Sequence, residues 1–569
     1  MCGGCHEPGA ATSGRPRARA APVPPATPGG SALLAPVRRR REGGPRRGPP
    51  GRAPPRRPRR LEPRPVTTTL VVLGAGGDLA SRLLLPGLAD LLVSHHGEGL
   101  DLRLVGADRA EHDQDWWTER VRGAAEAADA RGPAVDRLVE GTRYASCDVS
   151  ADDDLAGLVA EAAQDGDVVL YFALPPDVTA GALRSLEPEQ VPGGTRLVLE
   201  KPFGHDAASA AELNGVLTRL VPEDHVHRVD HFLGKSTVLN ILGLRFANRL
   251  FEPLWSATHV ERVDVVFDED LGLAGRAGYY DGAGALADMV QSHLLQLLAL
   301  IAMDPPATIS ERDLRDRKAE VLRATRLWDS GDPASCTRRA RWTAGRLGDE
   351  EVGAYADEPG VDPERGTETL AEVVLAVDTW RWAGVPFRLR SGKALGRRRK
   401  EAVITFKHVP HLPTGLLGTP SPTRLRIGFG PDDITLELDL NGQDDAFGLE
   451  RTALGTELSP GELTAYGQVL LGVLHGDPTL SVRGDTAEQC WRVLEPVVAA
   501  WRDGRVPLET YPAGTGGPRG HGLLEDVDAR ECAEDAQVAA ERGPRRAAGE
   551  GGSEGSGGEG RDGDDPPVA

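Results

Sequence analysis

The stretch of residues 67–92 constrains the fold most strongly, because a buried strand, a tight glycine turn and an amphipathic helix follow one another there. Further strand-like runs occur at residues 102–107, 168–173 and 196–200. Ala-rich helical stretches, such as 151–163 and 206–220, separate them. Strands that alternate with helices indicate a parallel, doubly wound sheet. We therefore expect an α/β, Rossmann-type coenzyme domain.

The second half of the chain has a different pattern. After about residue 230 the strands alternate with period two, as in residues 263–267 and 404–406, and a few long helices lie between them. This pattern favours an α+β domain with a large, mostly antiparallel sheet. We therefore divide the chain into a leader at 1–65, an α/β domain at 66–230, an α+β domain at 231–518 and a tail at 519–569.

Both ends of the chain lack apolar periodicity, and we expect them to be disordered. Residues 1–65 are rich in Arg and Pro, whereas residues 519–569 are rich in Gly and acids. An Arg-rich leader would suit organelle transit, but its many Pro and Gly residues argue against the usual amphipathic helix. A start codon placed too far upstream explains the leader equally well.

Charge and cysteine usage exclude several classes of protein. A formal net charge of −20 argues against general nucleic-acid binding, although the leader alone is basic. Only Cys2 and Cys5 have a paired spacing, so a reduced, cytoplasmic protein without a metal site fits best. No uninterrupted apolar run reaches the roughly 18 to 20 residues needed to span a bilayer, so we expect no membrane contact.

A glycine turn marks the expected coenzyme site. Residues 74–77 lie where the first strand enters the first helix, and backbone N–H groups at such a turn can hold a pyrophosphate. The second strand ends in Asp108 and Arg109, at the position that recognises the adenosine ribose. Arg109 favours the 2′-phosphate of NADP, whereas Asp108 could bind the free ribose hydroxyls of NAD; the sequence leaves both open.

Residues 228–235, RVDHFLGK, place a carboxylate, an imidazole and an ammonium in one short stretch. His231 and Lys235 suit a phosphate dianion, because both donate charge-assisted hydrogen bonds. Only six of the 66 Lys and Arg residues are lysines, which indicates that a lysine stands where a compact point charge is needed. Codon bias explains Lys318, Lys400 and Lys407 equally well.

A predicted helix at residues 285–303 carries the candidate general base, His293. A lone histidine on an apolar helix face is usually a core residue, but Asp288 and Gln291 precede it and Asp230 is available from the upstream motif. A carboxylate on one ring nitrogen would leave the other free to take a hydroxyl proton. Lys201 ends another parallel strand at its carboxyl edge, where ligands bind in such sheets.

With these motifs in view, the chain resembles the glucose-6-phosphate dehydrogenase family from about residue 67 to 518. The motifs that carry the resemblance are GAGGDLA at 74–80, EKPFG at 200–204, RVDHFLGK at 228–235, AGYYD at 277–281, DMVQSH at 288–293, WRWAGVPF at 380–387, RSGK at 390–393, GDPTL at 476–480 and YPAG at 511–514. The resemblance implies oxidation of D-glucose 6-phosphate at C1 to 6-phospho-D-glucono-1,5-lactone with NADP, the first step of the oxidative pentose phosphate pathway. A homodimer or homotetramer is implied in the same way.

The resemblance also implies a role for each matching residue. His293 would take the C1 hydroxyl proton, with Asp230 supporting it. The residues implied in substrate binding are Lys201, His231, Lys235, Glu269, Asp288, Lys393 and Arg398. Those implied in coenzyme binding are Gly74, Ala75, Gly76, Gly77, Asp78, Leu79, Ala80, Ser81, Arg109 and Lys201, with NADP as the coenzyme and NAD as a weaker alternative.

Four positions depart from the family pattern. Phe232 replaces a tyrosine of the phosphate site, Leu83 a common lysine and Ser292 an asparagine, while Gly516 in place of a tryptophan puts a second, structural coenzyme site in doubt. Two other interpretations remain. One is a related oxidoreductase for an unphosphorylated sugar or polyol, and the other is a catalytically silent homologue whose basic leader recruits nucleic acid or an acidic partner.

Overall fold

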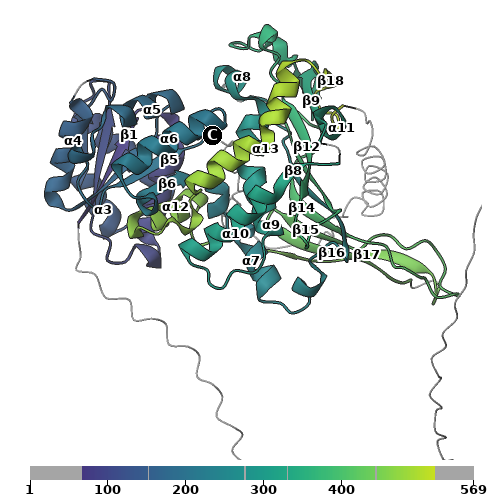
Figure 1. Ribbon diagram of the computed structural model, residues 1–569. Helices are drawn as coiled ribbons and strands as arrows, with labels where there is room; N and C mark the ends of the chain where they lie inside the picture. Colours follow the sequence, from purple (N-terminus) through teal and green to yellow (C-terminus); the bar gives the residue numbers. More distant parts are fainter. Residues whose placement is uncertain are drawn as a thin grey trace, which may run out of the picture. The chain divides into compact units, whose positions relative to one another are not determined.

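The computed structural model describes residues 67–518, apart from residues 152, 274–276, 330, 443–444 and 460. The predictions of a disordered leader at 1–65 and a disordered tail at 519–569 lie outside the described residues. Within the described range, two sheets carry the two halves of the chain (Figure 1).

The first sheet has six strands in the order β3-β2-β1-β4-β5-β6, and all the neighbouring strands pair in parallel. Its strands are β1 (Thr68–Leu73), β2 (Leu102–Asp108), β3 (Arg143–Ser146), β4 (Asp167–Phe172), β5 (Arg196–Glu200) and β6 (Val226–Val229). The near-continuous burial of β1 and β4 explains their apolar sequences, since helices cover both faces of the sheet. The predicted Rossmann-type sheet is confirmed.

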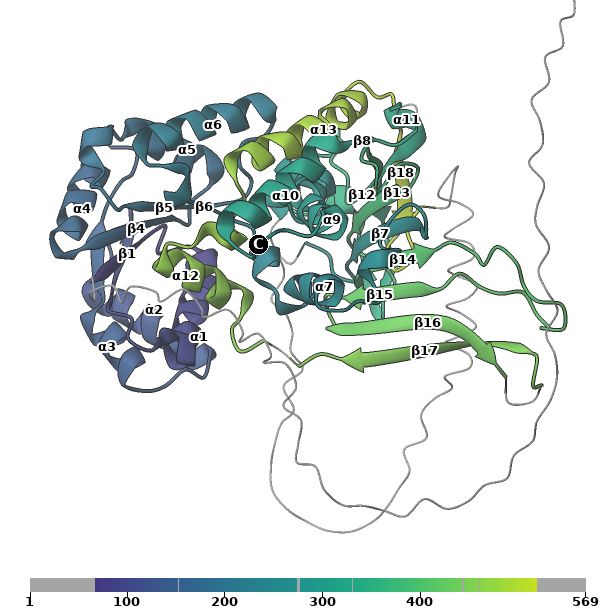
Figure 2. The same cartoon turned by 60° about the horizontal axis from the view of Figure 1, so that its bottom comes forward.

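Helices lie on both sides of this parallel sheet (Figure 2). One layer is formed by α1 (Leu85–Val93), α2 (Gln114–Ala127) and α3 (Pro133–Gly141), and the other by α4 (Asp154–Ala162), α5 (Pro176–Ser185) and α6 (Ala207–Leu220). The late helix α12 (Ala465–His475) returns to the first layer and packs against α1. A segment that the sequence assigns to the second domain thus completes the core of the first.

The second sheet is mixed and mostly antiparallel. Its main path runs β17-β16-β15-β14-β7-β13-β12-β9-β18, with β8 paired to β12, and only the pairs β7 with β13 and β9 with β18 are parallel. The strands are β7 (Val260–Asp268), β8 (Thr325–Leu327), β9 (Thr337–Thr343), β12 (Leu370–Val377), β13 (Pro386–Gly392), β14 (Arg399–Phe406), β15 (Arg424–Gly428), β16 (Asp433–Asn441), β17 (Leu449–Glu457) and β18 (Leu508–Pro512). Figure 2 shows β14 to β17 side by side.

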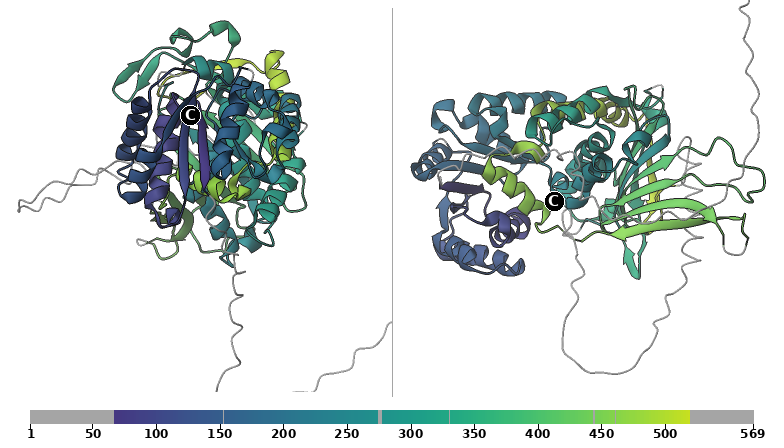
Figure 3. Two further views of the ribbon diagram at one scale, coloured as in Figure 1. Left: turned by 90° about the vertical axis from the view of Figure 1, so that its left-hand side faces the viewer. Right: turned by 90° about the horizontal axis from the view of Figure 1, so that it is seen from below.

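Helices cover one face of this sheet, and their buried side chains form a core that is continuous with the core on the α4–α6 side of the first sheet (Figure 3). They are α7 (Ser236–Phe246), α8 (Ala277–Ala285), α9 (Leu295–Ala302), α10 (Glu311–Ala324), α11 (Pro333–Cys336) and α13 (Gly484–Arg502); a short hairpin is formed by β10 (Gly345–Leu347) and β11 (Glu350–Val352). The run Tyr280–Ala302 is long and apolar enough to cross a membrane, but 94% of its apolar 18-residue window is buried inside the protein. It is therefore the central core helix of this domain.

Candidate active site

The structure brings His293 and Asp230 together, as the sequence predicts. His293 Nδ1 lies 2.5 Å from Asp230 Oδ1, and both side chains are completely buried. The carboxylate accepts from Nδ1, so the neutral imidazole carries its lone pair on Nε2. Neither His293 Nε2 nor Asp230 Oδ2 has a hydrogen-bond partner among the described residues. A buried nitrogen left open in this way is suited to take a proton from a ligand.

The helix that carries His293 has an irregular start and a π-helical turn. Gly284 has φ +70°, and a Cβ there would lie 2.4 Å from the Glu368 carboxylate, so only glycine fits. That carboxylate accepts a hydrogen bond from the backbone N–H of Leu286, where the π-helical stretch η8 (Leu286–Leu294) begins. Asp288 and His293 are five residues apart. Because a π-helix bonds residue i to residue i+5, it places these two side chains nearer to the same face of the helix than an α-helix would.

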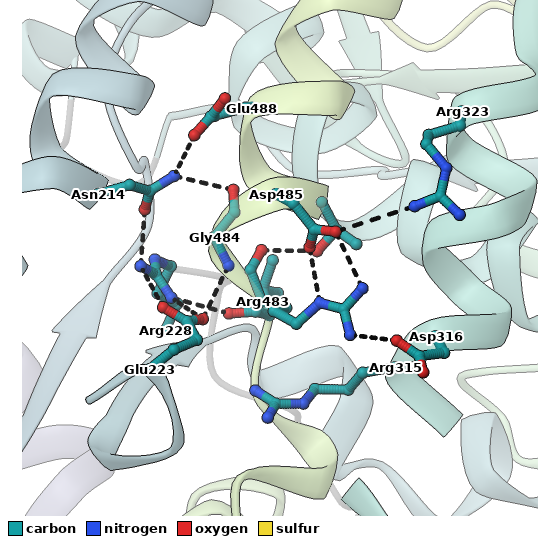
Figure 4. A network of polar contacts seen from close by, with 12 residues as sticks. Asn214, Glu223, Arg228, Arg315, Asp316, Arg323, Arg483, Gly484, Asp485 and Glu488 are labelled. Atoms are coloured by element: carbon teal, nitrogen blue, oxygen red, sulfur yellow. Dashed lines mark hydrogen bonds and ion pairs between the residues drawn. The ribbon is translucent and has the colours of Figure 1, made fainter. Parts of the chain in front are cut away.

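Asp230 lies on a different element from His293, at the end of strand β6. It follows β6 and precedes the short helix η6 (His231–Gly234), where its Oδ1 also accepts from the backbone N–H of Phe232 at 3.1 Å. Two residues earlier, the completely buried Arg228 binds both oxygens of Glu223, at 2.7 and 3.1 Å, and Asn214 at 2.6 Å (Figure 4). These bonds fix the end of β6 from which Asp230 projects.

The same network joins β6 to the start of α13. Asn214 donates to the carbonyl of Gly484 at 2.9 Å, and the Gly484 N–H donates to Glu223 at 2.9 Å (Figure 4). Because the completely buried Arg228 binds Glu223 and Asn214 at once, removing either of these two side chains would take away part of the hydrogen bonding of a buried charge. The strand that presents the acid is therefore tied to a helix of the second domain.

The charges of the pair follow from burial and mutual contact. Burial would raise the pKa of Asp230, but the neighbouring His293, His231 and Lys201 hold the pKa of this carboxyl at about 2. Burial also lowers the pKa of His293, and Lys201 adds to this effect, while Asp230 opposes it. The pair is thus a carboxylate next to a neutral imidazole at neutral pH, which is the state that a general base requires.

Lys201 and Asp288 form a second buried pair next to the first. Lys201 Nζ lies 2.7 Å from Asp288 Oδ1 and 2.9 Å from the Asp288 carbonyl oxygen, and the two side chains are 4% and 6% exposed. Burial would raise the pKa of Asp288, but Lys201 and Lys393 lower it below its usual range. Lys201 projects from the end of β5, and its bond to Pro202 is cis.

Glu269 forms a third polar group, with two lysines. Its Oε2 accepts from Lys393 Nζ at 2.5 Å, and its Oε1 lies 3.6 Å from Lys400 Nζ. Burial would raise the pKa of Glu269, but the two lysines lower it. Lys400 was not among the predicted site residues, although the scarcity of lysine in this chain was a signal for it. Parallel pairing of β13 with β7 and antiparallel pairing of β14 with β7 bring the three side chains together.

His231 lies beside the pair of His293 and Asp230, and Lys235 lies near Phe232. The ring of His231 is 4.9 Å from that of His293 and stacks on Tyr466 at 5.6 Å. Burial lowers the pKa of His231 well below its usual range, and His293 adds to this, so His231 is neutral here and its phosphate contact would be an ordinary N–H donation. Lys235 is partly exposed, with Nζ 5.1 Å from the centre of the Phe232 ring.

Phe232 packs directly on the proposed base. Its ring is completely buried and stacks on the His293 imidazole, with centres 4.0 Å apart and an interplanar angle of 12°. The sequence predicted only that Phe232 lacks a phosphate-binding hydroxyl. The structure adds that this ring supports His293 on one face. Tyr466, which comes from α12, had no signal in the sequence because the return of that helix could not be predicted.

The glycine turn has the geometry of a coenzyme site. Gly74 has φ +89°, and a Cβ there would lie 2.4 Å from the Ala173 carbonyl oxygen, so the turn requires glycine. The turn residues from Gly76 to Asp78 are exposed ahead of the helical run η1 (Ala80–Leu84) and α1. The N–H groups of Gly76 and Gly77 already donate to Asp108 and to the Gly74 carbonyl oxygen, but the first N–H groups of the helix that follows have no partner within the helix and suit a pyrophosphate. The residues present therefore fit a dinucleotide.

Asp108 and Arg109, the two residues that could recognise the adenosine ribose of the coenzyme, differ in their contacts. The Asp108 carboxylate accepts from the Gly76 N–H at 2.9 Å and from the Ala110 N–H at 3.4 Å. Arg109 is exposed next to it. The Asp108 carboxylate is thus partly engaged by the turn backbone, whereas Arg109 is an exposed residue.

Two further sets of residues lie apart from this constellation. Arg398 is exposed, and no contact joins it to the other predicted substrate residues that the structure describes. His95, His96 and Glu462 form an exposed group whose ligand atoms lie within 4.8 Å of one another, so they could hold a metal ion. No predicted catalytic residue belongs to that group.

Comparison with known proteins identifies the family. The model of the glucose-6-phosphate dehydrogenase NAD binding domain matches residues 71–240, and that of the glucose-6-phosphate dehydrogenase C-terminal domain matches residues 242–531. Glucose-6-phosphate 1-dehydrogenase of Zymomonas mobilis is 37% identical over 480 residues, covering 79% of this chain and 96% of the relative. Glucose-6-phosphate 1-dehydrogenase 2 of Mycobacterium tuberculosis is 39% identical over 481 residues, with 79% and 91% covered.

Solved structures give the same result. A crystal structure of glucose-6-phosphate 1-dehydrogenase from Mycobacterium avium has a TM-score of 0.68 at 33% identity and covers 80% of this chain and 95% of its own. A glucose-6-phosphate dehydrogenase in complex with its substrate glucose-6-phosphate has a TM-score of 0.71 at 26% identity, with 81% and 97% covered. Both halves of the fold are therefore shared with solved structures.

Proposed function

Because this chain belongs to the glucose-6-phosphate dehydrogenase family, we propose that it oxidises D-glucose 6-phosphate at C1 to 6-phospho-D-glucono-1,5-lactone, with NADP as hydride acceptor. The observation that carries the proposal is the buried bond between His293 Nδ1 and Asp230 Oδ1, which leaves His293 Nε2 open. The reaction would supply the oxidative pentose phosphate pathway. A cytoplasmic homodimer or homotetramer is the expected form, as in the sequence prediction.

In this reaction His293 acts as the general base. Its Nε2 takes the proton of the C1 hydroxyl as the C1 hydrogen leaves with its electron pair, and the C1–O bond becomes the lactone carbonyl. The nicotinamide supplies the hydride acceptor when the coenzyme is bound. Asp230 stabilises the imidazolium that forms, because its carboxylate lies 2.5 Å from Nδ1. Phe232 limits rotation of the ring by stacking on it.

The surrounding groups orient the sugar. Glu269 and Asp288 are carboxylates with depressed pKa values, so both accept hydrogen bonds from sugar hydroxyls at neutral pH. Lys201 is held by Asp288 at the carboxyl end of β5, where it can contact substrate and coenzyme together. His231 and Lys235 would bind the phosphate as donors, and Lys393 and Arg398 would add substrate contacts.

The coenzyme would bind along residues 74–81, with Arg109 at the 2′-phosphate. Two observations support NADP over NAD: Arg109 is exposed, and the Asp108 carboxylate already accepts from Gly76 and Ala110. NAD remains the weaker alternative, because a carboxylate at the end of the second strand can still bind ribose hydroxyls.

A substrate comparison tests the proposal. The full-length protein should reduce NADP with glucose 6-phosphate far more efficiently than with free glucose, since glucose lacks the group that His231 and Lys235 would bind. Equal kcat/KM for the two sugars would support the dehydrogenase of an unphosphorylated sugar. No NADP reduction with either sugar, together with salt-sensitive DNA binding that disappears when residues 1–65 are removed, would support the catalytically silent homologue.

A further inference from the structure

His95, His96 and Glu462 form a polar group to which the proposed reaction gives no role. The two histidines lie in the short helical turn η2 (His95–Gly97) that follows α1, and Glu462 lies in the segment that leads into α12. His95 Nδ1 lies 2.5 Å from Glu462 Oε1, and His96 Nε2 lies 3.9 Å from Glu462 Oε2. Because His95 and Glu462 are 367 residues apart in the chain, the fold itself brings these ligand atoms together.

Packing of α12 on α1 holds the glutamate near the end of α1. The two helices lie side by side (Figure 2) and approach closely at two glycines, since a Cβ at Gly87 of α1 would lie 2.9 Å from the backbone nitrogen of Gly467 in α12. Two residues after Glu462, the Thr464 N–H donates to Asp90 Oδ2 of α1 at 2.8 Å. Contacts outside the polar group therefore set the position of Glu462.

The turn that carries the two histidines is fixed as well. The Ser94 hydroxyl donates to the Leu91 carbonyl oxygen of α1 at 2.7 Å and accepts from the His96 N–H at 3.2 Å. The centres of the His95 and His96 rings are 3.8 Å apart, with 38° between the ring planes. The turn therefore directs two consecutive imidazoles toward the same carboxylate.

Two imidazole nitrogens and a carboxylate oxygen suit a transition-metal ion such as Zn²⁺. Zinc binds these atoms tetrahedrally at about 2.0 to 2.2 Å, which places neighbouring ligand atoms about 3.3 Å apart. The ligand atoms of this group lie within 4.8 Å of one another, and the side chains are 40% to 63% exposed, so small rotations bring them to that spacing and water can complete the coordination. Without an ion, so exposed a contact between His95 and Glu462 stabilises the fold little.

We propose that His95, His96 and Glu462 bind a divalent transition-metal ion of the zinc type, which joins the end of α1 to the segment that enters α12. The ion is structural, and it holds α12, whose Tyr466 ring stacks on His231 with the ring centres 5.6 Å apart. The expectation of no metal site rested on cysteine spacing, which carries no information about histidines that meet a distant glutamate.

Calorimetric titration with ZnCl₂ tests the proposal in chelator-treated, full-length protein that carries Cys2→Ser and Cys5→Ser. These two leader thiols have the spacing of a zinc-binding pair, so the background variant removes them. The cysteines that the structure describes, Cys147, Cys336 and Cys490, are buried. We expect one Zn²⁺ ion to bind per chain, and an excess of Mg²⁺ should not displace it, because Mg²⁺ prefers oxygen ligands.

Removing a ligand should weaken the binding of zinc. In the background protein, Glu462→Gln and His96→Ala should each raise the Kd for Zn²⁺ at least about tenfold. His205→Ala is the matched control and should leave the Kd unchanged. His205 is also exposed beside a carboxylate, with Nε2 3.9 Å from Asp206 Oδ2, but it belongs to no group of three such ligands among the described residues.

Thermal unfolding gives a second readout. Saturating Zn²⁺ should raise the melting temperature of the background protein by about 2 °C or more, and that of Glu462→Gln much less, because an ion that binds the folded state stabilises it. The absence of saturable binding, or an equal Kd in the background protein and both ligand variants, would overturn the proposal. An unchanged melting temperature at saturation would overturn the structural role. Neither readout depends on enzymatic activity, so the test is independent of the proposed function.

Discussion

Two charged regions of this protein use similar residues in opposite ways. On one face of the second sheet, a cavity is lined by the charged residues Asp264, Arg388, Arg399, Glu401, Arg424, Arg426 and Glu437. Arg388 pairs with Asp264, and Arg426 with both Glu401 and Glu437, across neighbouring strands. Asp264, for example, accepts from Arg388 at 2.6 Å and from Arg262 at 2.8 Å. In the group of residues around His293, by contrast, His293 Nε2 and Asp230 Oδ2 have no partner among the described residues.

The difference shows how to separate structural charges from functional ones. Buried ions that satisfy each other stabilise the fold only modestly, but each becomes costly when its partner is removed. A buried polar atom without a partner instead needs an explanation such as a ligand or a catalytic role. Substitutions in the sheet region should therefore change stability, and substitutions around His293 should change turnover or binding.

The largest expected effect is on stability, in Asp264→Asn. Asp264 is 2% exposed, and losing its charge leaves two arginines facing a neutral amide, which should lower the free energy of unfolding by about 3 kcal/mol. Chemical denaturation measures the loss, and kcat should stay within about twofold. Glu457→Gln, at an exposed site on β17, is the control and should change stability by less than about 0.5 kcal/mol. A large fall in kcat for Asp264→Asn would remove the contrast between the regions.

The next effect is on turnover, in His293→Asn. Removing the general base should lower kcat by roughly a hundredfold or more and leave the KM for glucose 6-phosphate nearly unchanged. Steady-state kinetics measure both quantities. His475→Asn is the control, since His475 is exposed at the end of α12 and should keep full activity. A raised KM at unchanged kcat would mean that His293 only binds the sugar.

A smaller effect is expected on coenzyme binding, when Arg109 is replaced in Arg109→Ala. Loss of a charge-assisted hydrogen bond should raise the KM for NADP roughly tenfold or more and change the KM for NAD little. Measuring both constants tests the assignment, with Arg137→Ala, at an exposed position on α3, as the control. Equal increases for the two coenzymes would remove Arg109 from the 2′-phosphate site.

The smallest expected effect comes from Phe232→Tyr. A hydroxyl restored at this position should lower the KM for glucose 6-phosphate by about twofold to tenfold, as expected for about 0.5 to 1.5 kcal/mol from one hydrogen bond. Phe232 is completely buried against His293 and Phe267, so melting temperature should be measured alongside KM. An unchanged KM with a lowered melting temperature would show that the hydroxyl meets the core rather than the phosphate.

Local patterns predicted much of the fold. The strand at 196–200 coincides with β5, and those at 67–73 and 102–107 differ from β1 and β2 by one residue, because buried parallel strands are continuous apolar runs between turn residues. The π-helical geometry of residues 286–294 was not predicted, since apolar periodicity does not distinguish it from an α-helix over so short a stretch. The packing of α12 on α1 depends on long-range contacts that no local pattern encodes.

The candidate site was predicted in its members but not in all its contacts. Motifs identified His293, Asp230, Lys201 and Asp288. In the structure, His293 is hydrogen-bonded to Asp230, and Lys201 forms an ion pair with Asp288 next to them. The approach of Lys400 to Glu269 depends on strand register in the second sheet, which the sequence does not specify.

A double-mutant cycle tests the central claim, that Asp230 and His293 act as one unit. The cycle compares kcat/KM for glucose 6-phosphate in the unaltered protein, Asp230→Asn, His293→Asn and the double variant. Because Asp230 works only through the imidazole, we expect the double variant to be no slower than His293→Asn alone. Losses that multiply across the two sites would show that the carboxylate and the imidazole act independently, and would contradict the account.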